Sequence, residues 1–213
     1  MMSRRNLTPE DEFAEVLRER AAIYGVAPDD ATVRLLQTYF LKVVAWNARL
    51  HLVAPCTPSE FATRHVLESL LAERFLAKGA RVVDIGSGAG LPAIPLLIAR
   101  PDIEAVLIEA SAKKSVFLRE ALSAVGRQAR ARVVAERFER LPRPDAHALT
   151  CRALERFAET LPAMLEWAEN VGTLLLFGGE SLRERLEASG QAFYSILAPE
   201  SERRFLFVVR REL

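Results

Sequence analysis

The chain has 213 residues, of which 50% are apolar and 27% are charged, and its formal net charge is +1. These values exclude a disordered chain and one that binds polyanions through its overall charge. The longest apolar run, Leu91–Ala99, is too short for a bilayer span, and no apolar segment of a secretory signal follows the basic start. The two distant cysteines, Cys56 and Cys151, form neither a disulfide framework nor a metal-binding pair. We therefore expect a cytoplasmic protein with no membrane partner.

Residues 1–78 are predicted to form a helical extension that packs on the rest of the chain. Apolar residues recur there at helical spacing in three segments. Thr8 and Pro9 favour the start of the first segment, and Thr57, Pro58 and Glu60 form a capping-box pattern at the start of the third. We expect helices over residues 8–25, 28–50 and 57–79.

From Arg81 onward, short β-branched or leucine-rich runs alternate with helical segments, so residues 79–213 are predicted to form an α/β domain. Its seven-stranded, mostly parallel sheet should be covered by helices on both faces. Only the turn segment PESER separates the last two runs, which predicts an antiparallel hairpin at the end of the sheet. We expect strands at residues 81–86, 104–109, 131–135, 146–151, 172–178, 192–198 and 204–210, and helices near 91–100, 111–125 and 155–168.

Three glycines at alternate positions follow the first strand. Asp84, Gly86, Gly88 and Gly90 form the pattern D-x-G-x-G-x-G, whereas the third glycine of a dinucleotide fingerprint would fall on Leu91. Glycine lacks a Cβ atom, so the chain can pass close to a flat or zwitterionic ligand here. The spacing favours a nucleotide-like cofactor without a pyrophosphate over a nicotinamide dinucleotide. A tight turn that binds no ligand is the simpler alternative.

Two carboxylates accompany the glycines. Glu109 closes the second strand, where it can accept hydrogen bonds from both hydroxyls of a ribose. The alternative for Glu109 is a solvated acid that caps the helix beginning at Ser111. Asp84 could order the glycine loop or, through water, meet a positively charged amino group.

The segments DIGSGAGLPAIPL, SAKKSVFLREAL, AERFE and CRAL resemble the RsmG (GidB) family of class I methyltransferases. The resemblance implies a Rossmann-like fold and methyl transfer from S-adenosylmethionine (SAM) to N7 of one guanine in 16S ribosomal RNA, with S-adenosylhomocysteine as the product. His51, Leu52 and Val53 depart from the family's N-L-T, Glu68 replaces an aspartate, and Ala93 replaces a glycine.

The resemblance also implies site residues. The SAM contacts of the family fall on Gly86, Leu91, Ala135, Glu136 and Arg152. Arg152 could orient the SAM carboxylate or a phosphate, or it could be a surface arginine paired with Glu155 or Asp145. His65 matches a histidine of the family and could position the substrate, or it could be a helix histidine satisfied by local hydrogen bonds.

Guanine N7 carries a lone pair and no proton, so its methylation requires no general base, and no catalytic base is nominated. The three histidines do not cluster with cysteine or acid at the spacing of metal ligands, so we expect no metal.

A local basic surface is expected if the substrate is RNA. Residues 111–152 contain ten basic and four acidic side chains, a local surplus of +6. Lys113 and Lys114 begin a helix beside the glycine loop although cations there oppose the helix dipole, which favours a phosphate-binding role for them and for Arg119. The alternative is an ordinary solvated helix face. The expected partner is 16S rRNA or the small ribosomal subunit, bound by a monomer.

Two further functions stay open at this point. The chain could methylate a small molecule or a protein, or it could be a non-catalytic RNA-binding assembly factor with a methyltransferase fold. Retention of both the glycines and Glu109 argues against a dead cofactor pocket.

Overall fold

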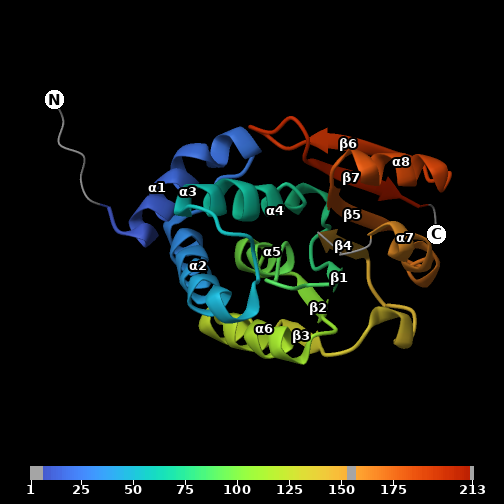
Figure 1. Cartoon of the computed structure of the whole chain (residues 1–213), viewed down its shortest axis with the longest axis horizontal. Coiled ribbons are helices and arrows are strands. Elements are labelled where there is room, and N and C mark those ends of the chain that lie inside the picture. Colours follow the sequence, from blue (N-terminus) through green and yellow to red (C-terminus); the bar gives the residue numbers. More distant parts are fainter. Residues whose placement is uncertain (1–6, 153–156, 212–213) are drawn as a thin grey trace.

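The computed structural model describes residues 7–152 and 157–211 and contains one seven-stranded sheet (Figure 1). The strand order is β3-β2-β1-β4-β5-β7-β6. The first five strands in this order are parallel, and β7 runs antiparallel to both β5 and β6. This confirms the predicted Rossmann-like sheet and its terminal hairpin. The strands are β1 (Arg81–Ile85), β2 (Glu104–Ile108), β3 (Ala131–Val134), β4 (Ala148–Arg152), β5 (Thr173–Gly178), β6 (Phe193–Leu197) and β7 (Phe205–Arg210).

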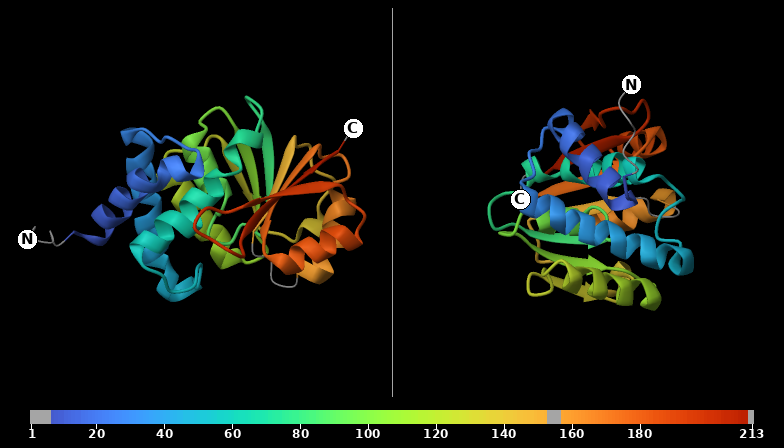
Figure 2. Two further views of the ribbon diagram at one scale, coloured as in Figure 1. Left: turned by 90° about the horizontal axis from the view of Figure 1, so that it is seen from above. Right: turned by 90° about the vertical axis from the view of Figure 1, so that its left-hand side faces the viewer.

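Helices cover both faces of the sheet, and each face has its own apolar cluster (Figure 2). On one face, Ile94 of α5 and Phe117 of α6 belong to a cluster that includes Val82 and Leu107 of the sheet. On the other face, α7 and α8 pack over the alternate strand residues. The helices of this part of the chain are α5 (Ala93–Ala99), α6 (Ala112–Ala124), the 3₁₀ turn η4 (Phe138–Arg140), α7 (Phe157–Trp167) and α8 (Glu180–Ala188).

Helix α8 is an element that the sequence analysis did not predict. Its segment is largely polar, and only Leu182 and Leu186 are buried. The predicted helix at 155–168 is observed from Phe157 onward, and residues 153–156 lie outside the described ranges.

The N-terminal helices pack on the same face as α5 and α6 and share their apolar cluster. Phe13 of α1 stacks on Phe40 of α2 with ring centroids 4.8 Å apart, and Phe61 contacts both rings. The buried hydroxyl of Tyr39 donates to the carbonyl of Ala89 at 2.7 Å, which ties α2 to the glycine loop. The division into two domains stays a prediction. The elements are α1 (Pro9–Arg20), η1 (Ala21–Tyr24), α2 (Asp30–Leu50), α3 (Pro58–Glu60), η2 (Phe61–Leu67), α4 (Glu68–Leu70) and η3 (Glu73–Phe75).

The third predicted helix, over 57–79, is wrong as one continuous α-helix. It begins with the predicted capping box between Thr57 and Glu60, continues as a π-helix in η2, returns to α-helix in α4, and ends in the 3₁₀ turn η3. A π-helical insertion widens the helix and commonly occurs at functional sites. Here it contains His65 and immediately precedes Glu68.

Candidate cofactor site at the carboxyl edge of the sheet

The glycine loop turns back over the end of β2. The backbone N–H groups of Gly86 and Ser87 both donate to the carbonyl of Ile108, and all three motif glycines have positive φ, at 66°, 51° and 87°. A Cβ atom on Gly90 would lie 2.4 Å from the side chain of Ile94, whereas one on Gly88 would meet nothing closer than 3.7 Å. Gly90 therefore permits close packing of the loop on the core, and Gly88 borders open space.

Glu109 lies directly beside this loop. Its carboxylate accepts hydrogen bonds from the backbone N–H of Gly88 at 2.9 Å and of Ser111 at 2.8 Å. Helix capping at Ser111, the alternative role for this residue, is therefore present, but the acid is only 9% exposed rather than solvated. A carboxylate has about four acceptor positions, so two remain for the hydroxyls of a ribose.

Asp84 lies beneath the glycine loop and is completely buried. Thr150, its register partner on β4, donates to Oδ1 at 2.6 Å, while Oδ2 has no hydrogen-bond partner among the described residues. Burial raises the pKa of Asp84 to about 7. An unpaired buried carboxylate oxygen is costly, so its presence here fits a donor group supplied by a cofactor or by an ordered water.

Arg152 ends β4, one residue beyond the paired Ile85 and Cys151 of the adjoining strands. It is a mostly covered side chain rather than a freely exposed surface arginine, since the side chain is 13% exposed. Asp145, one of the two suggested partners, instead forms an ion pair with Arg81. The other suggested partner, Glu155, lies outside the described residues.

The partners of Arg152 come from the N-terminal helices. Its Nη2 donates to the carbonyl of Arg64 at 2.6 Å and to Glu68 at 3.3 Å, and its guanidinium lies over the ring of Phe177. Burial lowers the pKa of Arg152, and Glu68 opposes that shift. Nη1 is buried without a partner in the described structure. One terminal nitrogen of the guanidinium is thus held by the protein, and the other is available to an acceptor.

His65 also has a buried nitrogen without a partner. The ring packs against Phe61 with centroids 5.1 Å apart, and its Nδ1 accepts or donates no hydrogen bond within the described ranges. Burial, followed by the positive charge of Arg152, lowers the pKa of His65 to about 3, so the imidazole is neutral at physiological pH. The alternative of a histidine satisfied by local hydrogen bonds does not hold for Nδ1.

The remaining predicted cofactor residues are Leu91, Ala135 and Glu136. Leu91 is 7% exposed and belongs to the apolar core. Ala135 is exposed just after β3, next to Val134, whose carbonyl accepts from the N–H of Glu109. Glu136 accepts from the backbone N–H of Arg137 at 2.8 Å, which orders the start of η4.

Helix α6 begins beside Glu109 and places two lysines next to the candidate site. Ser111 caps the helix by accepting from the N–H of Lys114. Within the ranges that the structure describes, neither Lys113 nor Lys114 has an acidic side chain at ion-pair distance. Arg119 donates to the carbonyl of Val133 at 3.3 Å and has a second, longer contact with Ser115, so this guanidinium braces α6 against β3.

Much of the basic surplus in residues 111–152 is engaged within the protein. Arg127 donates to the carbonyls of Leu97 and Ile98, which end helix α5. Three other arginines form ion pairs: Arg130 with Glu104, Arg140 with Glu136, and Arg143 with Glu169. Lys113 and Lys114 have no such internal partner in the part of the chain that the structure describes, as is also true of the side chains of Arg132 and Arg137. The two lysines differ from these arginines in lying at the start of α6, beside Glu109.

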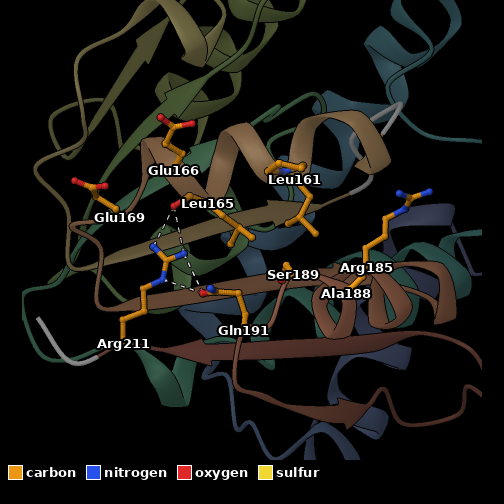
Figure 3. Close-up of a pocket in the computed structure, with 10 residues that line it drawn as sticks. Leu161, Leu165, Glu166, Glu169, Arg185, Ala188, Ser189, Gln191 and Arg211 are labelled. Carbon is orange, nitrogen blue, oxygen red and sulfur yellow. Dashed lines mark hydrogen bonds between the residues drawn. The ribbon is translucent and has the colours of Figure 1, made fainter.

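A groove of about 980 Å³ lies beside α1, and two further grooves lie elsewhere. One, of about 690 Å³, runs between α7 and α8 (Figure 3). Figure 3 shows Arg211 reaching the carbonyl of Leu165 and the amide oxygen of Gln191. The guanidinium that lines this groove is therefore already bonded to acceptors of the protein. The other, of about 570 Å³, lies under the connector between η4 and β4. Neither contains a residue of the glycine loop.

Three residues at this edge belong to no sequence motif: Tyr39, Thr150 and Arg204. Thr150 is signalled only by its register opposite Asp84. Tyr39 and Arg204 contact the site from segments far away along the chain, so strand and helix prediction could not have found them. In the sequence, Glu68 differs from the aspartate of the family pattern, but this difference does not predict its contacts with two arginines.

Solved structures of several methyltransferases share this fold. A precorrin-6y C5,15-methyltransferase from Geobacter metallireducens aligns with 68% of this chain and 86% of its own, with a TM-score of 0.53 and 15% identity. A tRNA methyltransferase of B. subtilis aligns with 68% of this chain and 65% of its own, with a TM-score of 0.52 and 16% identity. At these identities the likeness establishes the fold alone.

Sequence comparison identifies the family. Ribosomal RNA small subunit methyltransferase G of Sorangium cellulosum is 39% identical over 86% of this chain and 78% of its own length. The protein of the same name from Anaeromyxobacter dehalogenans (strain 2CP-1) is 36% identical over 84% of this chain and 85% of its own. The model of the family described as rRNA small subunit methyltransferase G matches residues 32–205. The chain therefore belongs to the rRNA small subunit methyltransferase G family.

Proposed function

We propose that this protein transfers a methyl group from SAM to N7 of one guanine in 16S rRNA. The observation that carries the proposal is the placement of Glu109. Its buried carboxylate joins the glycine loop to the start of α6 at the carboxyl edge of the sheet, where α/β proteins bind their ligands. Family membership supplies the reaction class and the RNA substrate.

The residues of this edge fit SAM. Glu109 retains acceptor positions for the ribose hydroxyls, and the open space beside Gly88 allows a ligand to approach the backbone. The unpaired Oδ2 of Asp84 can accept from the ammonium group, directly or through water, and the free Nη1 of Arg152 can donate to the carboxylate. The exposed backbone at Ala135 and the Glu136 carboxylate would receive the adenine edge.

SAM, when bound, supplies a methyl group that its sulfonium has already activated. The protein then has to orient the acceptor and exclude water, because guanine N7 has no proton to remove. His65 is suited to this surface, since its neutral imidazole adds no positive charge where the methylated guanine acquires one. Arg152 is better suited to the cofactor carboxylate than to the guanine, because a guanidinium would oppose that developing charge.

We place the RNA-binding surface at the start of α6. Lys113 and Lys114 have no acidic partner among the described side chains and lie next to Glu109, so they can hold phosphates close to the reacting base. Arg119 extends this surface, but it should contribute less to RNA binding than the lysines because its guanidinium also donates to the carbonyl of Val133. The enzyme is proposed to act as a monomer, and a ribosomal substrate implies the cytoplasm. Among the described helices, none has the length and apolar character needed to cross a bilayer.

The test is methyl transfer from labelled SAM to small ribosomal subunits that lack the modification. Digestion to nucleosides and mass spectrometry should reveal 7-methylguanosine at a single site, and naked 16S rRNA assayed in parallel would show which form is the substrate. A different methylated nucleoside, or none from either RNA, would contradict the proposal. The Gly88→Val variant serves as the inactive control.

A further inference from the structure

Glu68 is a buried carboxylate that two arginines from different parts of the sheet share. Its side chain is 4% exposed. Oε2 accepts from Nη2 of Arg152 at 3.3 Å, and Oε1 accepts from Nε of Arg204 at 2.6 Å. The acid belongs to α4, whereas Arg152 ends β4 and Arg204 directly precedes β7. Glu68 thus connects the N-terminal helices to both strands at the site edge.

These contacts fix the direction of the Arg152 guanidinium. Nη2 is held from two sides, by the carbonyl of Arg64 and by Glu68, and the flat group lies 5.6 Å from the ring centroid of Phe177. A planar guanidinium held at one nitrogen and against one ring has little freedom to rotate. Nη1 is consequently kept apart from these protein acceptors, as the buried nitrogen without a partner among the described residues.

The charges of the cluster point to the ligand that Nη1 would bind. Among the described side chains, one carboxylate contacts two guanidinium groups, and the neighbouring His65 is neutral, so these groups together have a surplus of one positive charge. Arg152 is 13% exposed and Arg204 is 37% exposed, so Arg152 is the cation with less access to solvent. An unpaired buried charge is strongly unfavourable, and a carboxylate bound to a guanidinium offsets it through charge-assisted hydrogen bonds. The carboxylate of SAM is an anion of this kind.

We propose that Glu68 is a positioning residue for SAM binding, which holds Arg152 so that Nη1 faces the cofactor carboxylate, with Arg204 fixing Glu68 in turn. This inference rests on the proposed SAM site. Glu68 acts through Arg152 and does not itself touch the cofactor. The N-terminal helices thereby contribute to cofactor affinity without lining the cofactor.

The test is a double-mutant cycle on the full-length protein, with the dissociation constant of S-adenosylhomocysteine measured by calorimetry. Glu68→Gln should weaken binding on the order of tenfold, because the Arg152 guanidinium would no longer be held in the direction that the cofactor carboxylate needs. Arg152→Gln should weaken it at least as much. In the Arg152→Gln background, Glu68→Gln should cause no further loss, because its effect passes through Arg152. Additive losses would overturn the inference and leave Glu68 a purely structural residue.

Two other variants keep the test decisive if Glu68→Gln does not fold. Arg204→Gln changes a partly exposed side chain and frees one oxygen of Glu68, so it should weaken binding several-fold. Tyr24→Phe is the matched control, because it removes a hydrogen bond from the same helical region to Pro199, in the same β6–β7 turn, without involving Arg152. Its dissociation constant should stay within about twofold of the wild type, since no contact to the guanidinium is lost. Equal effects of Arg204→Gln and Tyr24→Phe would refute the positioning role.

The wild-type titration separates the two proposals. If the unaltered protein binds neither SAM nor its product, the proposed function fails, and this inference fails with it. If it binds and Glu68→Gln binds equally well, only the positioning role is overturned.

Discussion

The two halves of the carboxyl edge are built in different ways. In the acidic half, Asp84, Gly88 and Glu109 come from one continuous segment that runs from β1 through the glycine loop and α5 to the end of β2, and the backbone N–H of Gly88 joins the loop to the second carboxylate. In the basic half, Glu68, Arg152 and Arg204 come from three distant segments, and side chains hold one another. The acidic half is therefore determined by local sequence, while the basic half exists only once the whole chain has folded. The two halves have opposite charges, which suits the ammonium and the carboxylate of SAM, the ligand proposed for this edge.

The largest effect is expected from Gly88→Val in the acidic half. A β-branched residue is strained at a φ of 51°, and its side chain would enter the space beside the loop rather than the protein core. SAM affinity should fall by about a hundredfold or more, the loss expected when a clash removes close backbone contact. Calorimetry measures the affinity, and circular dichroism should show an intact fold.

Gly79→Val provides the matched control for this strain. Gly79 has a φ of 68°, and a Cβ atom added there would have nothing within 4 Å, but the residue lies before β1, at the other end of the strand. Both variants should lose about 1–2 kcal/mol of stability. Equal SAM affinities in the two variants would show that the glycine loop does not bind the cofactor.

Gly90→Ala should lower the stability of the fold more than it lowers the affinity for SAM. The added carbon would lie 2.4 Å from Cδ1 of Ile94 and 3.2 Å from Leu118, at a φ of 87°. Overpacking and backbone strain together should lower the free energy of unfolding by about 2–4 kcal/mol. Urea denaturation measures the loss, with Gly79→Ala as the comparison for strain alone. Similar losses in both variants would mean that the core adapts and that Gly90 is not needed for packing.

The stability of the protein should depend on pH through two buried groups, His65 next to the basic half and Asp84 in the acidic half. The pKa of His65 is lowered to about 3 in the folded state, so the unfolded chain takes up the proton first as the pH falls below 6.5. The stability that neutral His65 provides is therefore complete above pH 6.5 and is lost toward pH 3. Asp84 acts oppositely: its pKa is raised to about 7, so its contribution is complete below its ordinary value near 3.8 and is lost as the pH rises through 7.

His65→Gln removes the first of these effects and leaves the second. Relative to the wild type, the variant should gain at most about 1.4 kcal/mol of unfolding free energy for each unit by which the pH falls, from about 6 to about 4. Urea denaturation at several pH values measures the difference. Parallel stability curves for the two proteins would show that His65 titrates normally and is not held in a buried, neutral state.

The smallest effect concerns a surface outside both halves. Replacing Lys113 and Lys114 together by glutamine should reduce the slope of log affinity for RNA against log salt concentration by about one to two units, and it should leave SAM affinity unchanged. Arg130→Gln is the control, since Arg130 is a basic residue of the same region already paired with Glu104. An unchanged slope in the double variant would place the RNA surface elsewhere.

The contrast between the halves also explains what sequence could predict. Strand boundaries were predicted within one or two residues because each buried strand is a short apolar run between breakers. The position of Glu109 at the carboxyl edge of the strand next to the glycine loop followed from parallel strands ending at one edge, although its hydrogen bond with Gly88 was not predicted. By contrast, Glu68 is 84 residues from Arg152 and 136 from Arg204, and no periodicity relates such positions. The π-helix escaped prediction because its residues have ordinary helical propensity, and its widening depends on tertiary packing.

We propose that both halves of the edge bind one molecule of SAM. The most direct measurement is a crystal structure of the protein with S-adenosylhomocysteine. We expect ribose hydroxyls on Glu109, an amino group directed toward Asp84, and a carboxylate on Nη1 of Arg152. A ligand bound in the groove between α7 and α8, or one that leaves Glu109 and Arg152 without contact, would contradict this proposal.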